Sequence, residues 1–264
     1  MIRLIQIKVR NIPIYIGLLV AQLITLIPIA SVFIKAFFKI ENEAVVFSLN
    51  EFENILLLSE KFHKAYANSL IISLLITVGQ VIIGIVLAWI FTAYQFPLKK
   101  FLWTVILFTM ILPPQATLVQ NYSIMNQLEL IDTYRGVIYP QLFYPIGVIF
   151  LRKYFSRISQ DVIDAGYLDG TNKVTQLTSI ILPICKNGIY LLAFLSFIDS
   201  YNIYELPLVL LRDLSKMPLS LLVRNIIENY PDEIFVPALI YMIPAVIVFL
   251  FARNTIMSGL IYDE

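Results

Sequence analysis

The sequence has little of the material that builds covalent frameworks or metal centres. Its 264 residues include one cysteine, Cys185, and one histidine, His63. A single cysteine cannot form an internal disulfide, and a single histidine leaves no histidine cluster for a metal ion. His63 lies between Lys61 and Lys64 and is expected to be a solvated loop residue. The sequence therefore predicts neither a disulfide-linked fold nor a metal site.

Charge is also scarce. Charged residues make up 14% of the chain, and the net charge is +1, whereas a globular domain carries about 25% charged residues. Such a balance provides no basic field to attract nucleic acid. Apolar residues reach 59%, with a mean hydropathy of +0.82. So small a chain cannot bury this much apolar surface in its own core, so the composition predicts a polytopic membrane protein.

Several functional motifs are missing. The chain has no G-x-x-x-x-G-K-[ST] loop, so it is not expected to bind nucleotide phosphates itself. It has neither H-E-x-x-H nor G-x-S-x-G, which argues against an intramembrane enzyme, although that class is kept as a remote alternative. A stand-alone secondary carrier would be expected to show two related halves, and no internal repeat is visible.

Uncharged stretches of about 20 residues predict an all-α fold with six transmembrane helices. No linker divides the chain, so residues 1–264 are expected to form a single transmembrane domain. The first apolar run is too long for a cleavable signal and is expected to remain as an anchor. Pro113-Pro114 should kink or end the third helix. The predicted spans are 12–34, 67–94, 101–121, 136–153, 184–208 and 236–255.

The distribution of basic residues predicts the orientation. With the amino terminus inside, eleven Lys and Arg residues fall on the inner side and eight on the outer side. The inner ones lie in short loops close to helix ends, where the positive-inside rule is strongest. Acidic residues gather in the first outer loop, at Glu41, Glu43, Glu51, Glu53 and Glu60. Both termini are therefore expected to be cytoplasmic, in a multi-pass protein of the cytoplasmic membrane.

One inner loop is long enough to hold helices of its own. Residues 154–183 follow the fourth span, and Ser159 is expected to cap a helix that begins at Gln160. Gly170 suits the left-handed residue that ends this helix, and Thr171 or Asn172 should cap a second one. Ala165-Gly166 is expected to form a smooth patch where another protein can approach. This shape favours docking over catalysis.

This loop resembles a motif of a known family. Asp164-Ala165-Gly166, Gly170 and Ile180-Ile181-Leu182-Pro183 match the E-A-A-x₃-G-x₉-I-x-L-P loop of ABC importer permeases without a gap. Asp169 supplies the Asp before Gly that is usual in the sugar-type branch. The sequence departs from the motif in two places, with Asp164 for Glu and Gly166 for the second Ala.

The resemblance extends over roughly residues 65–260. Pro113-x-Gln115, Leu118, Tyr122 and Leu130-Ile131-Asp132-Thr133-Tyr134 are similar to a run in carbohydrate-uptake permeases. Asn68-Ser69, Ser200-Tyr201-Asn202 with Pro207-Leu208, and Ser258-Gly259-Leu260 match further family segments. Glu129 replaces the Gly of the run, Tyr201 replaces a Trp, and the usual basic tail is missing. Six spans and a short first outer loop resemble the second, smaller permease subunit of maltose-type importers.

The resemblance implies a function and a set of partners. The chain would be one membrane-spanning subunit of an ATP-driven importer of an oligosaccharide or sugar-like solute. A different permease, two copies of a cytoplasmic ABC ATPase and an outer solute-binding protein would complete the transporter. ATP with magnesium would bind the ATPase subunits, and no cofactor is expected on this chain. A non-sugar solute, such as a glycerol phosphodiester or an amine, is the alternative. The residues implied in ATPase coupling are Asp164, Ala165, Gly166, Asp169, Gly170, Leu182 and Pro183.

Asp199 is the most informative charge within a span. A carboxylate at that depth costs about 2.5–3.5 kcal/mol on insertion scales, so it should face the bundle interior or a water-filled cavity. We expect Asp199, Tyr201 and Asn202 to line the translocation path. A structural pair between Asp199 and another polar group, or the partner subunit, is the alternative. Glu205 lies near the outer interface, where a carboxylate is inexpensive.

Overall fold

The structure is a computed structural model that describes residues 12–41, 44–55, 59–230 and 233–261. Its contacts divide the chain into two units, Met1–Ser59 with Ile226–Met242 and Glu60–Asn225 with Ile243–Glu264. Arg3, Lys8, Arg10 and Glu43, which contributed to the orientation prediction, lie outside the described residues, as does the tail at 262–264.

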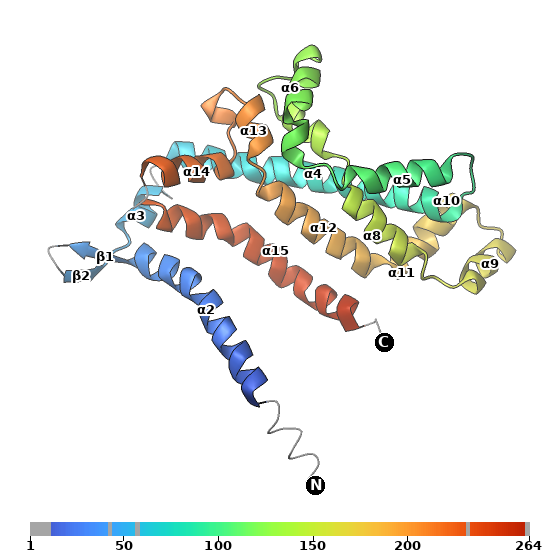
Figure 1. The fold of residues 1–264 in the computed structure, drawn as a ribbon, viewed down its shortest axis with the longest axis horizontal. Helices are drawn as coiled ribbons and strands as arrows, with labels where there is room; N and C mark the ends of the chain where they lie inside the picture. Colours follow the sequence, from blue (N-terminus) through green and yellow to red (C-terminus); the bar gives the residue numbers. More distant parts are fainter. Residues whose placement is uncertain (1–11, 42–43, 56–58, 231–232, 262–264) are drawn as a thin grey trace, which may run out of the picture. The chain divides into compact units, whose positions relative to one another are not determined.

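The first unit contains the first apolar helix and a small hairpin (Figure 1). Helix α2 (Ile12–Phe37) leads into β1 (Phe38–Glu41), which pairs antiparallel with β2 (Ala44–Phe47) and is followed by α3 (Asn50–Glu53). The ring of Phe37 stacks on those of Phe47 and Phe52. The hairpin is a local exception to the all-α expectation, because Val45, Val46 and Phe47 are residue types that favour strands.

All regular secondary structure among the described residues of the second unit is helical. Its elements are α4 (Glu60–Ala93), α5 (Lys99–Thr109), η2 (Pro114–Thr117), α6 (Leu118–Gln127), α7 (Tyr134–Ile138), η3 (Tyr139–Gln141), α8 (Pro145–Phe155), α9 (Gln160–Leu168), α10 (Lys173–Gln176), η4 (Leu177–Ile181), α11 (Leu182–Ile184), α12 (Lys186–Tyr201), α13 (Glu205–Leu210) and η5 (Leu214–Lys216). Helix α14 (Leu219–Asn229) and helix α15 (Phe235–Ile261) each cross the boundary between the units.

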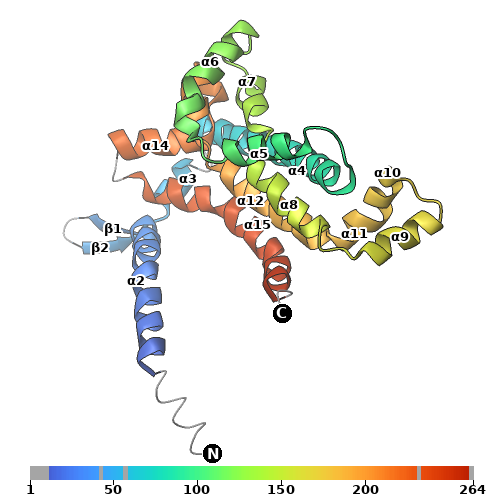
Figure 2. The same cartoon turned by 45° about the vertical axis from the view of Figure 1, so that its right-hand side comes forward.

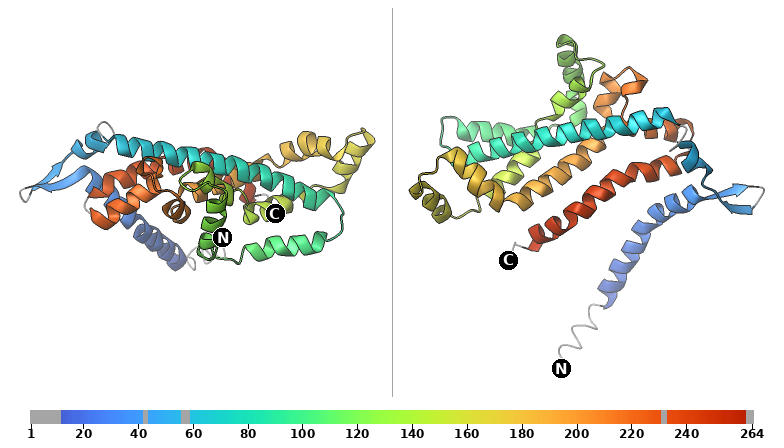
Figure 3. Two further views of the ribbon diagram at one scale, coloured as in Figure 1. Left: turned by 90° about the horizontal axis from the view of Figure 1, so that it is seen from above. Right: turned by 180° about the vertical axis from the view of Figure 1, so that it is seen from behind.

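Helix α4 is the axis of the second unit. Helices α8 and α12 pack along it, and the views in Figures 1, 2 and 3 all place α9 and α10 beyond one end of α4. At the amino-terminal half of α4, Ile72 and Ile76 pack with residues of α6, α7 and α13. At the carboxy-terminal half, Ala88 and Trp89 pack with residues of α8, η4 and α12. The two ends of α4 therefore belong to two separate apolar clusters.

A polar seam joins α4 to α12 between these clusters. The hydroxyls of Thr77 and Ser200 lie 3.3 Å apart, and Ser196 donates to the Oε1 of Gln80. Gln80 in turn donates to the carbonyl of Gln141 at 2.6 Å. Small polar residues let membrane helices approach closely and satisfy one another where water is absent. The seam thus fixes the register of α4 against α12.

Among the described residues, three helices are long and apolar enough to cross a membrane: 14–37, 60–93 and 235–253. Two bent pairs could each make a further span, with bends of 106° between α5 and the η2–α6 segment and 79° at the α11–α12 break. The first bend confirms that Pro113-Pro114 ends its helix. Region 136–153 is divided among α7, η3 and the 11-residue α8. The six-span count and the single domain stay predictions.

Candidate functional site: an exposed helical loop and a polar pocket

Helix α9 of the inner loop ends in a left-handed turn at Gly170, whose φ is +78°. The amide of Gly170 donates to the carbonyl of Tyr167, and the amide of Thr171 donates to that of Gly166, each at 3.0 Å. These two bonds satisfy carbonyls that the helix end would otherwise leave unpaired, in a Schellman motif. The left-handed conformation expected of Gly170 at the end of this helix is confirmed.

The two caps predicted for this loop have different outcomes. The side chain of Asn172 accepts from the amides of Val174 and Thr175 at 3.0 and 2.9 Å, and so caps α10. Helix α9 begins at Gln160 as expected, but its N-cap residue Ser159 makes no side-chain capping bond. The prediction that the Ser159 hydroxyl caps α9 is therefore wrong, although its extended backbone still precedes the helix.

Ala165 and Gly166 face in different directions. Ala165 is exposed, whereas Gly166 is buried against the rest of the loop. A Cβ at Gly166 would lie 2.9 Å from the Cδ1 of Ile180 and 3.1 Å from the Oγ1 of Thr171. The expectation that both residues form a patch for another protein is wrong for Gly166. Its missing side chain lets α9 pack against the following helix of the same loop.

The exposed side of α9 combines carboxylates with a protruding apolar side chain. Asp161, Asp164 and Asp169 are exposed, and Leu168 is 90% exposed. Gln160 donates to the Oδ1 of Asp164 at 2.9 Å, one helical turn away. In the remainder of the predicted coupling set, Leu182 is half-buried and Pro183 is exposed at the start of α11. This arrangement suits a partner with basic groups around an apolar hollow.

The loop is fastened to the carboxy-terminal end of α4. The indole Nε1 of Trp89 donates to the carbonyl oxygen of Lys173 at 3.1 Å. The ammonium of Lys173 donates to the carbonyl of Ala93 and lies 4.3 Å above the ring of Tyr94. These contacts bond α10 of the loop directly to the end of α4.

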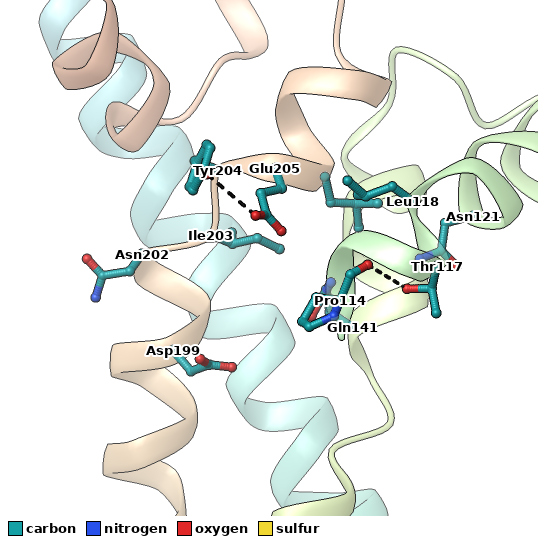
Figure 4. A pocket seen from close by; sticks show the side chains of 11 residues that line it. Pro114, Thr117, Leu118, Asn121, Gln141, Asp199, Asn202, Ile203, Tyr204 and Glu205 are labelled. Atoms are coloured by element: carbon teal, nitrogen blue, oxygen red, sulfur yellow. Dashed lines mark hydrogen bonds between the residues drawn. The ribbon is translucent and has the colours of Figure 1, made fainter. Parts of the chain in front are cut away.

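A second candidate site is a polar pocket of about 230 Å³ between the η2–α6 segment and the α12–α13 segment. Figure 4 shows Asp199 and Glu205 reaching it from the α12–α13 side. Gln115 donates to the Oε1 of Glu205 at 2.7 Å, so the pocket's two sides are linked. Asp199 is exposed and makes no hydrogen bond or ion pair with the part of the chain that the structure describes. An unpaired carboxylate here is available to a solute.

Asn202 and Tyr201, the other two residues predicted to line the translocation path, differ from Asp199 in where their side chains point. Asn202 lines the pocket together with Asp199, but in Figure 4 its amide points away from the Asp199 carboxylate, and it donates to the carbonyl of Ile198 at 2.7 Å. Tyr201 is 2% exposed and stacks on Phe197 with ring centroids 5.6 Å apart. The structure thus places the Tyr201 side chain in the packed interior, and the pocket lining does not include it.

Sequence reasoning gave no role to Asp132, which holds the outer segment before η5. Its Oδ1 accepts from the amides of Arg212 and Asp213, each at 3.0 Å, and its Oδ2 pairs with the ammonium of Lys216 at 2.9 Å. The amide of Asp213, then Lys216, then the amide of Arg212 lower the pKa of Asp132 to about 2. Its backbone is left-handed, with a φ of 59°. Asp tolerates this conformation, and the Asp-Thr-Tyr motif was the available signal.

Asn68 completes this outer clamp from α4. It donates to the carbonyls of Ser215 and Met217 at 2.8 and 3.0 Å, and accepts from the hydroxyl of Tyr134 at 2.8 Å. Next to it, the hydroxyl of Ser69 accepts from the amide of Leu219 at 2.7 Å. The motif residues Asn68, Ser69, Asp132 and Tyr134 therefore fix the segment between α13 and α14.

Within the described ranges, no group of three His, Cys, Asp or Glu side chains could hold a metal ion. A polytopic helical chain with an exposed helical loop at one end and a polar pocket near the other belongs to the class of membrane transport proteins. No protein family model matches the chain.

The relatives are more specific. The chain is 28% identical over 199 residues to the arabinooligosaccharides transport system permease protein AraQ of Halalkalibacterium halodurans, covering 74% of this chain and 71% of that protein. It is 25% identical over 205 residues to the sn-glycerol-3-phosphate transport system permease protein UgpE of Brucella abortus, covering 75% and 72%. The family recognised from the sequence is thereby confirmed: the chain's homologues are permease proteins of sugar-type transport systems.

Solved structures show the same fold. A bacterial ABC transporter involved in the import of the acidic polysaccharide alginate matches with a TM-score of 0.82, at 22% identity over 94% of this chain and 96% of that one. The alginate transporter in complex with an alginate pentasaccharide-bound periplasmic protein matches with a TM-score of 0.72 and 17% identity, over 96% of each chain. The arrangement of helices is therefore that of an ABC transporter subunit.

Proposed function

We propose that this chain is a membrane-spanning permease subunit of an ATP-driven ABC importer. One observation carries the proposal: an exposed helix, α9, belongs to a loop that is bonded directly to α4, the longest helix of the unit. A partner that binds α9 and moves can thereby displace α4. Asp164, Ala165, Asp169 and Leu168 are the residues of this loop that a partner would contact, and Gly166, Gly170, Leu182 and Pro183 shape it.

The remaining subunits follow from the same proposal. A cytoplasmic ATPase, present as two copies, binds ATP with magnesium and docks on α9. A second, different permease completes the path, and an outer solute-binding protein delivers the solute. The solute-binding protein is supported by the alginate transporter, whose structure is in complex with an alginate pentasaccharide-bound periplasmic protein. With six spans and both termini in the cytoplasm, as we propose from the sequence, α9 would lie on the ATPase side.

The polar pocket supports a neutral, hydroxyl-rich solute. Asp199, Glu205, Gln141 and Asn121 offer hydrogen-bonding groups that suit a carbohydrate, and the relative AraQ is named for arabinooligosaccharides. The relative UgpE is named for sn-glycerol 3-phosphate, so a glycerol phosphate is the second candidate. Two carboxylates would repel a phosphate. The charge of the pocket therefore favours the sugar.

The test is uptake by the assembled transporter in proteoliposomes. Wild-type chain with its ATPase, partner permease and solute-binding protein should import solute only when ATP is supplied inside. Gly170→Pro should uncouple ATP hydrolysis from uptake while leaving membrane insertion intact, because the left-handed φ of Gly170 is inaccessible to proline. Gly170→Asn, which tolerates that conformation, is the matched control. Normal coupling in Gly170→Pro would overturn the coupling role, and ion-driven uptake without the ATPase would overturn the whole proposal.

A further inference from the structure

A cavity opens where α5 begins, and its lining includes none of the residues predicted for the translocation path or for ATPase coupling. It has a volume of about 540 Å³ and lies between the turn after α4, the first turns of α5, and α8. Lys99, Lys100 and Arg152 give its lining three positive charges, and none of its lining residues is acidic. Since like charges repel, an anion is the natural occupant of such a cavity.

Arg152 is held in an unusual environment. Its guanidinium carbon lies 3.9 Å from the centroid of the Trp103 ring, a close cation–π contact. Its Nε is buried and has no hydrogen-bond partner in the part of the chain that the structure describes. A desolvated guanidinium normally pairs with a carboxylate or phosphate. Arg152 forms no such pair with a described carboxylate, so its charge is uncompensated.

Three lysines near Arg152 add positive charge at the cavity. Lys99 donates to the carbonyl of Tyr94 at 2.7 Å, and the ammonium of Lys173 lies over the ring of the same Tyr94. Lys100 is exposed at the cavity, with no described hydrogen bond or ion pair. The first turn of α5 adds the positive end of its helix dipole. All of these groups favour the binding of one anionic head.

The surface next to the cavity is apolar. Beyond Lys100, helix α5 exposes Phe101 at 62%, Val105 at 43% and Phe108 at 62%. A ligand with its anion at Lys100 would therefore have its remaining part along an exposed hydrocarbon surface. Trp103, an amphipathic side chain of a type enriched at the membrane interface, lines the cavity beside this surface. The occupant thus needs an anionic head joined to an apolar tail.

We propose that this cavity binds the phosphate of an anionic phospholipid of the inner leaflet. Phosphate is the shared chemistry of a lipid head and of free phosphate, and the apolar face of α5 selects the lipid. The bound head neutralises Arg152 and Lys100, and its acyl chains lie along Phe101 and Phe108. The site is independent of the solute and of coupling to the ATPase.

The test uses the purified, assembled transporter in phosphatidylcholine nanodiscs that contain phosphatidylglycerol as the probe lipid. Native mass spectrometry counts the phosphatidylglycerol retained by the wild type and by Arg152→Gln and Lys100→Gln variants. Removing one basic residue from a lipid-phosphate site weakens the apparent affinity about fivefold. Lys153→Gln is the matched control, because Lys153 is exposed on the same helix, carries the same charge and does not line the cavity.

Retention that falls in Lys100→Gln and Arg152→Gln but not in Lys153→Gln would support the site. Lys100→Gln keeps the test decisive if Arg152→Gln fails to fold, because Lys100 is exposed. Equal retention in wild type and Lys100→Gln would overturn the proposal, as would an equal loss in Lys153→Gln. Displacement of the lipid by inorganic phosphate alone would overturn the lipid as the source. Retention that appears only after the ATPase is removed would show a protein occupant instead.

Discussion

The indole of Trp89 and the main chain of Lys173 are joined by a 3.1 Å hydrogen bond. Trp89 is 5% exposed near the end of α4, and Lys173 begins α10. The Trp89 ring also packs edge-on against Phe155, with centroids 6.4 Å apart. One side chain thus connects a long helix to the loop that is proposed to dock the ATPase.

Trp89→Phe should weaken the coupling between the loop and α4. The ring keeps its apolar packing, but the carbonyl of Lys173 loses its donor, at a cost of about 1 kcal/mol. We expect ATP hydrolysis to continue while solute imported per ATP falls. The measurement is the ratio of uptake to hydrolysis in proteoliposomes. Thr92→Val, which removes only a bond to Ala88 within α4, should leave this ratio unchanged. A fall of equal size in both variants would contradict the prediction.

Gly166→Ala should destabilise the inner loop, because the added methyl would lie 2.9 Å from the Cδ1 of Ile180. Overpacking of this kind costs about 1–3 kcal/mol. The measurement is the thermal inactivation midpoint of the purified transporter. Removing the obstructing methyl with Ile180→Val in the same chain should restore part of the loss. Additive losses in the double variant would show that Gly166 is required for another reason.

The outer clamp should loosen in acid. The pKa of Asp132 is lowered from 3.8 to about 2 in the folded chain, so the folded state favours the carboxylate. Its stabilising effect is fully present above pH 4 and is lost as the pH falls toward 2. Hydrogen exchange of residues 211–217, corrected for intrinsic rates, should therefore accelerate over that window.

Asp132→Asn is the control for this pH dependence. The variant should exchange faster at neutral pH and show a flatter acid response. Some acid dependence should remain, because the amide of Ser215 also lowers the pKa of Asp213. A wild-type segment that exchanges equally at pH 5 and pH 2 would contradict the role of the clamp.

Asp199→Asn should impair uptake without loosening the fold. Asp199 has no partner among the described residues, so its loss leaves no group of the chain unsatisfied. If a solute hydroxyl donates to its carboxylate, the variant loses a charged hydrogen bond, and the apparent affinity should fall about tenfold. The measurement is the concentration dependence of uptake beside the thermal inactivation midpoint. Asn202→Ala removes another pocket-lining group of α12, but the Asn202 amide already donates to the carbonyl of Ile198, so this variant should have a smaller effect on affinity.

Much of the inner loop was predictable from local chemistry. A glycine needed at a positive φ and an asparagine followed by two free amides are short-range signals, and Gly170 and Asn172 behave as they predict. The break at Pro113-Pro114 has the same origin. The capping bond predicted for Ser159 is absent, although its extended backbone still precedes the helix. The exposed patch predicted at Gly166 is wrong because which face of a short helix is exposed depends on what packs against it.

The sequence by itself determined that this chain is a membrane protein, which family it resembles, and that the helical loop would turn at Gly170. The hydropathy pattern and the backbone preferences of proline and glycine act over a few residues, so their effects can be predicted from the sequence. Only the tertiary structure decided that Trp89 reaches Lys173, that Asp132 clamps the segment around Lys216, and that Arg152 stacks on Trp103 beside Lys99 and Lys100. These pairs are 84, 84 and 49 positions apart, and their contacts depend on how helices pack in three dimensions.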